Sequence, residues 1–352
     1  MFAFAFFLLT RAEGGERLEA EHGSVPVVVP SAPLFYSLLQ PALPALSRSW
    51  GALAAAPLPA LVPLYSSLAG CDPGEAEHEL SHYTTVSQFF TRRLRPGARP
   101  ICPASPLVSP ADGTLTYCGP LEGSYTHPVK GIQYSLPAFL GGLATIPGLL
   151  DTQANTNDDT KVDTQLDTQP DTQLDTPQHH EKVEVVVAPC TQLLLSRPRT
   201  VLYESIVYLS PADYHRFHSP ADWTVVARRH LPGKLYSVSP RLVRRWPALL
   251  TTNERVAWLG RWQHGTFALV AVAATNVGDI RADWDPDLAT NTATTARPTE
   301  KRYEKPVKFS RGQEFGYFNF GSTIVLIYEA PFDMKFKNAT TTKIKMGQSL
   351  LV

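Results

Sequence analysis

Residues 320–331 read Phe-Gly-Ser-Thr-Ile-Val-Leu-Ile-Tyr-Glu-Ala-Pro, in which a Gly-Ser-Thr turn leads directly into an apolar segment. Segment 324–328 has the length and the β-branched composition of a β-strand. Short apolar runs of the same kind, separated by turn residues, occur at 113–117, 182–187, 201–209, 224–226 and 266–273. We therefore predict an α+β fold with a mainly β core of antiparallel sheets, sandwich-like or barrel-like in form.

The chain before residue 100 has a different composition. Residues 75–94 carry good helix formers and apolar side chains at a helical spacing, which predicts a helix. Residues 33–68 are rich in Leu, Ala and Pro, which indicates short helices broken at prolines. Three prolines interrupt the apolar stretch 50–65, so it either lies on a membrane surface or packs against the protein's own core.

Residues 151–182 contain Asp-Thr-Gln at 151, 163, 167 and 171, followed by Asp-Thr-Pro at 175. A short repeat of polar residues buries neither a helical nor a strand face, so we interpret the segment as a disordered insertion without chemistry. Residues 1–30 are predicted to form a poorly ordered leader.

Charge and cysteine content exclude some classes of function. The chain has 32 Lys plus Arg against 32 Asp plus Glu, which argues against a nucleic-acid-binding protein with a basic face. Its four cysteines form no Cys-x-x-Cys pair and show no metal-ligand spacing. We therefore expect neither a nucleic-acid partner nor a metal site.

Three short motifs carry groups capable of chemistry. Residues 109–114 read Ser-Pro-Ala-Asp-Gly-Thr, residues 214–218 read Tyr-His-Arg-Phe-His, and residues 320–323 read Phe-Gly-Ser-Thr. Taken singly, the first and third are turns that enter strands. His215 and His218 could share one side of a helical turn but not of a strand, and they could be metal ligands, although no third ligand is evident.

Taken together, the motifs supply a nucleophile, a base and an orienting group: Ser322, His218 and Asp112. The chain lacks the Gly-x-Ser-x-Gly elbow of a hydrolase, and a glycine precedes Ser322. The Ser322 hydroxyl can attack the carbonyl of Gly321 through a five-membered ring, and a residue without Cβ tolerates the required backbone geometry. His218 would take the hydroxyl proton, and Asp112 would orient the imidazole.

Five ordered stretches resemble the phosphatidylserine decarboxylases, and together they cover most of residues 80–350. They are the Ser-Pro-Ala-Asp-Gly-Thr motif, residues 129–136, 208–220 and 274–278, and residues 311–331. The resemblance implies self-cleavage between Gly321 and Ser322, which converts Ser322 into a covalent pyruvoyl cofactor. A Schiff base with that group would decarboxylate phosphatidylserine to phosphatidylethanolamine. The resemblance also implies that His218 serves cleavage and that His215 serves decarboxylation as an acid–base group.

The resemblance further implies how the chain is divided and where it acts. Residues 1–80 would form the leader and the membrane-proximal helical region, 81–321 the β-chain part and 322–352 the α-chain with the pyruvoyl end. The expected partners are phosphatidylserine, a membrane surface and a second copy in a homodimer. The expected location is the mitochondrial inner membrane, on the intermembrane-space side, although this sequence shows no evident targeting segment.

Two alternatives remain at this point. A serine hydrolase would use Asp112, His218 and Ser322 on an external ester and would stay one intact chain. A non-catalytic, β-rich carrier module would have ordinary turns at the Asp-Gly and Gly-Ser pairs.

Overall fold

The computed structural model describes residues 49, 51–121, 136–142, 195–197, 199–239, 243, 249–274, 279–292, 297–319, 322–336 and 341–352. The leader, the strand predicted at 182–187 and the polar insertion lie outside these residues. The strands predicted at 113–117, 201–209, 224–226, 266–273 and 324–328 are all confirmed.

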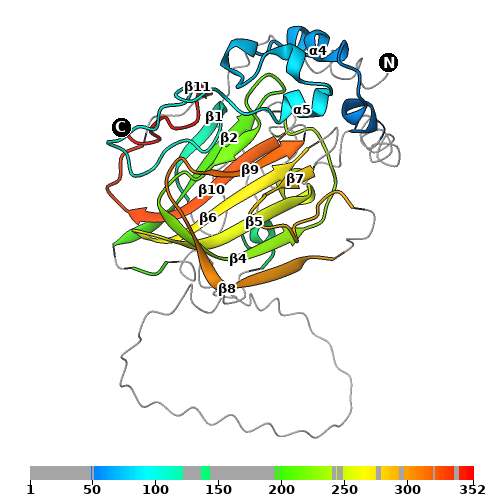
Figure 1. Ribbon diagram of the computed structural model, residues 1–352. Coiled ribbons are helices and arrows are strands. Elements are labelled where there is room, and N and C mark those ends of the chain that lie inside the picture. The colour runs from blue at the N-terminus through cyan, green and yellow to red at the C-terminus, as the bar shows by residue number, and fades with distance from the viewer. Residues whose placement is uncertain are drawn as a thin grey trace, which may run out of the picture.

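One large antiparallel sheet forms the centre of the molecule (Figure 1). Its strand order is β11-β1-β2-β10-β6-β5-β4-β8, so β11 and β8 lie at open edges and the sheet does not close into a barrel. The strands are β1 (Gly113–Pro120), β2 (Thr200–Leu209), β4 (Trp223–Leu231), β5 (Arg255–Trp262), β6 (Gly265–Ala273), β8 (Thr299–Phe309), β10 (Ser322–Pro331) and β11 (Thr342–Ile344).

A second sheet packs on one face of the first and gives the sandwich form of the prediction. It has the order β3-β9-β7, built from β3 (Arg216–His218), β9 (Glu314–Asn319) and β7 (Asp279–Arg281). Its aromatic side chains meet those of the large sheet: the ring centroids of Phe217 and Trp258 are 6.1 Å apart, and those of Phe315 and Trp223 are 5.7 Å apart.

The opposite face of the large sheet is covered as well. Two short helices, α6 (Leu136–Leu140) and α8 (Leu249–Thr252), contribute to a second apolar cluster on that face. Along β10, Ile324 and Leu326 belong to the first cluster while Val325 and Ile327 belong to the second. Burial on both faces explains why this strand is a continuous apolar run and not an alternating one.

The single helix predicted over residues 75–94 is wrong. The structure has three short pieces there: two 3₁₀ turns, Pro73–Glu75 and Leu80–His82, and the helix α5 (Val86–Phe90). Ala76 pairs with Leu94 as an antiparallel bridge, and the Glu77 amide donates to the Arg93 carbonyl. The chain therefore folds back on itself, and this tertiary pairing overrides the local helical pattern.

The prediction of short, proline-limited helices fits α4 (Leu61–Ala69), which Gly70 ends in a left-handed conformation with φ of +77°. Side chains of α4, the second 3₁₀ turn and α5 form a separate apolar cluster that includes Val62, Phe89 and Phe90. We call this part of the chain, residues 51–94, the N-terminal unit. In the described part of the chain, no helix is both long and apolar enough to span a membrane.

The N-terminal unit lies at one end of the large sheet (Figure 1). The Tyr65 hydroxyl donates to the Pro211 carbonyl at 3.0 Å, just beyond the end of β2. The Ser87 hydroxyl on α5 lies 3.3 Å from Asn319 Oδ1, at the end of β9. These contacts place the N-terminal unit beside the C-terminal ends of β2 and β9.

Candidate active site

Ser322 is the first residue of β10, the strand at the centre of the large sheet. It pairs with Leu209 of β2 and with Ala273 of β6, and its side chain is fully buried. Its Oγ has no hydrogen-bond partner among the described residues. Because an unpaired buried hydroxyl costs about 1–3 kcal/mol, this serine is not explained by stability.

His218 is at the end of β3 and is almost completely buried. Its Nδ1 lies 2.9 Å from the Gly312 carbonyl oxygen, which can only accept, so Nδ1 carries the proton. Burial lowers the pKa of His218, which keeps the ring neutral near pH 7. Nε2 then holds the lone pair and accepts from the Tyr214 hydroxyl at 3.0 Å. This imidazole is therefore a neutral, oriented base.

His215 has a different environment. Its ring lies against Phe90 of the N-terminal unit, with 3.8 Å between ring centroids, and Nδ1 donates to the Asp213 carbonyl at 2.8 Å. Nε2 is buried and has no partner in the part of the chain that the structure describes. Burial lowers the pKa of His215 to about 3, so Nε2 carries no proton near neutral pH.

The two histidines lie at opposite ends of the β3–β9 pairing. The Phe318 amide donates to the His215 carbonyl at 3.0 Å, whereas His218 pairs with Glu314. Because β9 runs from Glu314 towards Ser322, the backbone of His215 is opposite the end nearer to Ser322. The extended backbone rules out a helical turn shared by the two rings, and their separate surroundings suit separate tasks.

The expected hydrogen bond between Asp112 and His218 does not form, because both ring nitrogens of His218 have other partners. Asp112 is buried and accepts from Arg99 Nε at 2.8 Å and from the Met346 amide at 2.8 Å. The motif nevertheless contacts the histidine, since the His218 amide donates to the Pro110 carbonyl at 2.7 Å. Asp112 thus anchors a segment that holds His218, and Gly312 orients the ring.

Arg99 connects Asp112 to two further charges. Its buried guanidinium donates to Asp112 and to Glu75, and Lys345 Nζ lies 2.6 Å from Glu75 Oε1. Hydrogen bonding from Arg99, with a smaller contribution from Lys345, lowers the pKa of Glu75 to about 2. Burial by itself would lower the pKa of Arg99, but its bonds to Asp112 and Glu75 raise it.

This network predicts a pH-dependent stability. A carboxyl whose pKa is depressed by folding stabilises the fold above its unfolded pKa of about 4.3, and this stability is lost as pH falls towards about 2. We expect Glu75→Gln to lower the urea midpoint at about pH 6 and to have roughly half that effect at about pH 3, since the folded pKa of about 2 still leaves the carboxyl mostly ionised there. The comparison is best made in a Ser322→Ala background, so that every sample is a single chain.

Glu304→Gln is the matched control, because Glu304 is an exposed carboxylate that forms no ion pair with any described residue. It should leave the urea midpoint unchanged at both pH values. An equal effect of Glu75→Gln at both pH values would contradict the electrostatic account.

Sequence reasoning missed three groups. Tyr214 is within the quoted motif, but in an extended segment a spacing of four residues does not predict that its hydroxyl contacts the ring of His218. Arg99 is one of many arginines, and only its pairing with Asp112 distinguishes it. Gly312 acts through its carbonyl, which has no signature in the sequence.

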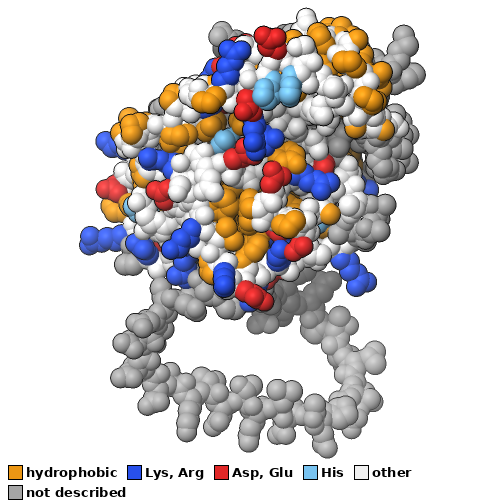
Figure 2. Space-filling view, viewed as in Figure 1, with side chains coloured by type: hydrophobic (Ala, Val, Ile, Leu, Met, Phe, Trp, Pro, Cys, Tyr) orange, Lys and Arg blue, Asp and Glu red, His pale blue; other side chains and the backbone are white. Residues whose placement is uncertain are grey.

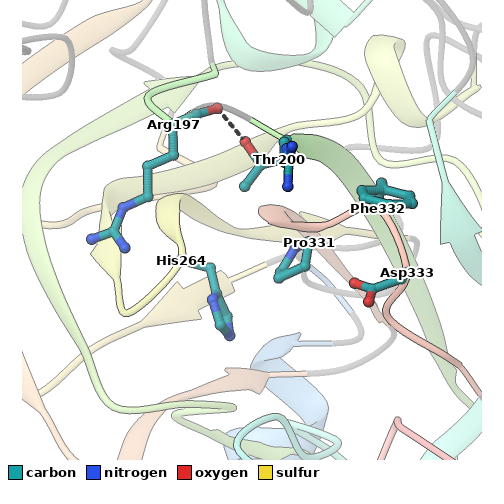
Figure 3. A pocket seen from close by; sticks show the side chains of 7 residues that line it. Arg197, Thr200, His264, Pro331, Phe332 and Asp333 are labelled. Carbon is teal, nitrogen blue, oxygen red and sulfur yellow. Dashed lines mark hydrogen bonds between the residues drawn. The ribbon is translucent and has the colours of Figure 1, made fainter.

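A separate pocket of about 440 Å³ lies at the far end of β10, around Pro331, Phe332 and Asp333 (Figure 3). His264 and Arg197 also line it, and the Thr200 hydroxyl donates to the Arg197 carbonyl at its wall. None of the predicted site residues contributes to it. Among the described residues, no cluster of three or more His, Cys, Asp and Glu side chains could hold a metal ion.

Ser322, His215 and His218 are all buried in the β core, and their side chains are the nucleophilic and basic groups that the motifs predicted. Comparison with known sequences identifies the family. The family model named phosphatidylserine decarboxylase matches residues 86–167 and 178–352. The chain therefore belongs to the phosphatidylserine decarboxylase family, which confirms the resemblance stated from the motifs.

Individual relatives agree. A mitochondrial phosphatidylserine decarboxylase proenzyme of Pongo abelii is 39% identical over 318 residues, spanning 87% of this chain and 70% of the relative. Proenzyme 1 of Schizosaccharomyces pombe is 38% identical, over 90% of this chain and 82% of the relative. Proenzyme 1 of Saccharomyces cerevisiae is 34% identical, over 90% of this chain and 73% of the relative. All three names include the word mitochondrial.

Proposed function

We propose that this chain decarboxylates phosphatidylserine to phosphatidylethanolamine after cutting itself between Gly321 and Ser322. Family membership over most of the chain supports the reaction. The observation that carries the self-cleavage is Ser322 itself, a fully buried serine at the head of a central strand whose hydroxyl has no partner among the described residues.

Self-cleavage begins when Ser322 Oγ attacks the preceding carbonyl, that of Gly321, and converts the amide into an ester. His218 Nε2 is the proton acceptor that this step needs, since Nδ1 is already occupied by Gly312. The Tyr214 hydroxyl donates to the same lone pair. It therefore either moves aside when the serine proton is transferred or passes that proton on to His218. Loss of the α-proton of Ser322 then expels Gly321 as a carboxylate and cuts the chain, and the resulting dehydroalanine, through its imine form, is hydrolysed by water to the pyruvoyl group and ammonia.

The position of Ser322 in the fold supports such a group. The small product, residues 322–352, contains β10, which keeps its pairing with β2 and β6 after the cut and so holds the new end in the core. The pyruvoyl carbonyl would supply an electron sink for a substrate amine. His215 would then be the residue that returns a proton, from Nε2, to the substrate carbon. Because Nε2 is unprotonated in the free enzyme, the anionic substrate has to raise the pKa of His215 before that step.

The two alternative functions are less compatible with the structure. A serine hydrolase is disfavoured because the family model and the relatives that this chain matches are phosphatidylserine decarboxylases. A carrier module would be more stable with an apolar residue at position 322, because the buried, unpaired hydroxyl destabilises the fold and a carrier makes no use of it.

The substrate is a lipid, so the enzyme has to contact a membrane surface. The N-terminal unit presents Leu53, Leu58 and Leu64 with 43–51% of each side chain exposed, and Figure 2 shows apolar side chains over α4. These leucines are suited to shallow insertion between lipids. The family resemblance supports a homodimer, and the relatives' names support a mitochondrial location, which we assign to the inner membrane on the intermembrane-space side.

Intact-mass measurement of the purified protein tests the proposal. We expect two chains, one ending at Gly321 and one spanning 322–352 with a keto group in place of its amine. The small chain should resist Edman sequencing and should gain the expected mass on borohydride reduction. A single uncut chain, or a small chain that begins with a free serine amine, would disprove the pyruvoyl assignment.

A further inference from the structure

A second pocket, of about 380 Å³, lies on the N-terminal unit where residues 77–93 meet β3. Basic and imidazole side chains dominate its lining: His78, His82, Arg92, Arg93 and Arg216. The acidic side chain that lines it is Glu77. We call it the basic pocket. None of its lining residues has a role in the proposed self-cleavage.

Arg92 is the most informative of these residues. Only 5% of it is exposed, and its guanidinium lies over the Phe89 ring with 4.6 Å to the centroid. Its Nη1 contacts the Phe89 carbonyl at 3.3 Å, while Nε has no acceptor and no carboxylate forms an ion pair with it among the described residues. A buried cation without a counter-ion is expensive, so its placement beside a pocket indicates an anionic ligand.

The arginines around the basic pocket outnumber the carboxylates that could neutralise them. Glu314 contacts both Arg216 and Arg93, the latter at 3.6 Å. Three arginines against Glu77 and Glu314 leave the pocket with a formal charge of +1 without any contribution from the histidines. The imidazoles of His78 and His82 lie with their ring centroids 4.0 Å apart and provide further N–H donors.

The location indicates the source of the anion. Apart from Arg216, the residues that line the basic pocket belong to the same N-terminal unit as the exposed leucines, and a single apolar cluster packs inside that unit. Figure 2 shows histidine side chains, with basic and acidic ones beside them, next to the apolar surface over α4. Leucines that enter the apolar layer of a membrane bring the N-terminal unit, and with it the basic pocket, close to the layer of headgroup phosphates.

We propose that the basic pocket binds the phosphate of an anionic phospholipid headgroup and thereby docks the N-terminal unit on the membrane. The proposal rests on the lipid-directed function proposed above. The guanidinium groups of Arg92 and Arg93 recognise the phosphate oxygens, and the imidazole N–H groups complete the site. Free phosphate offers the same oxygens, so the test has to separate it from lipid.

The test is co-sedimentation of the Ser322→Ala chain with phosphatidylcholine vesicles that do or do not contain phosphatidylglycerol. Phosphatidylserine is left out, so that binding is measured without substrate or turnover. We expect binding to require phosphatidylglycerol, and Arg93→Gln to weaken the partition coefficient about fivefold, as one interfacial cation does. The double variant His78→Gln/His82→Gln should weaken it further, and Arg92→Gln more than Arg93→Gln, provided that its thermal unfolding shows an intact fold.

Arg302→Gln is the matched control, because Arg93 and Arg302 are similarly exposed (59% and 52%) and each contacts a glutamate. Arg302 is on the edge strand β8, outside the basic pocket, so its removal should leave binding unchanged. If Arg93→Gln and Arg302→Gln weakened vesicle binding equally, the effect would come from the overall charge of the protein, and the proposed pocket would be contradicted. Wild-type partitioning of the pocket variants, or a pocket saturated by inorganic phosphate with no change in vesicle binding, would overturn the proposal. Either result leaves self-cleavage and decarboxylation to be judged separately.

Discussion

Replacement of Ser322 by alanine should leave the protein as one uncut chain, and replacement of His218 by alanine should do the same. The first removes the attacking oxygen, and the second removes an oriented base whose ring is neutral and whose Nε2 lone pair accepts from Tyr214. Groups that act as one unit lose most of the rate when either is removed, so we expect cleavage to slow by at least about 10⁴-fold. The measurement is the fraction of cut chain against time on a denaturing gel, starting from freshly translated protein.

Two control variants test whether the loss of cleavage is specific to Ser322 and His218. Ser310→Ala removes an exposed hydroxyl from a turn, and His264→Ala removes an imidazole from the turn between β5 and β6, so both should cut normally. Asp112→Ala should also remain uncut, because it releases the anchor to Arg99 and Met346 that holds the segment touching His218. Normal cutting in His218→Ala would exclude this base and direct attention to His215, whose backbone is nearer to Ser322 along β9.

Replacement of His215 by alanine should have the opposite profile: a cut chain with little decarboxylation. His215 Nε2 is buried without a partner among the described residues and is therefore available to move a proton. General acid–base help of this kind accounts for about 10²–10⁴-fold in rate, and we expect a loss of kcat in that range. A paired assay on one preparation gives both readings: cut chain by gel, and carbon dioxide from labelled phosphatidylserine.

The ring of His215 also packs on Phe90, so the alanine variant opens a cavity. His215→Gln fills more of that space and separates a packing defect from a lost proton donor. Both variants should be cut, and both should be slow in turnover. A cut His215→Gln protein with full activity would remove His215 from the reaction, and a variant of normal thermal stability that fails to cut would assign it to cleavage.

The sequence by itself determined the β core and its central strand. Strand 324–328 is recognisable because both of its faces are buried, so every position has to be apolar and β-branched residues fill it. Gly321 and Ser322 can also be predicted as a reactive pair from the sequence, because the attacking hydroxyl and the attacked carbonyl belong to adjacent residues. Motif order then identified the family without any knowledge of contacts.

Only the tertiary structure decided the rest. The helical pattern of residues 75–94 gave way because Ala76 pairs with Leu94, and no local signal predicts that the chain doubles back. The orienting acceptor of His218 is a backbone carbonyl from Gly312, and Asp112 is engaged by Arg99, an arginine that resembles many others in the sequence. Hydrogen bonds of this kind depend on distances between segments far apart in the chain. The residue types are encoded locally, but which donor meets which acceptor is fixed only when the sheets pack.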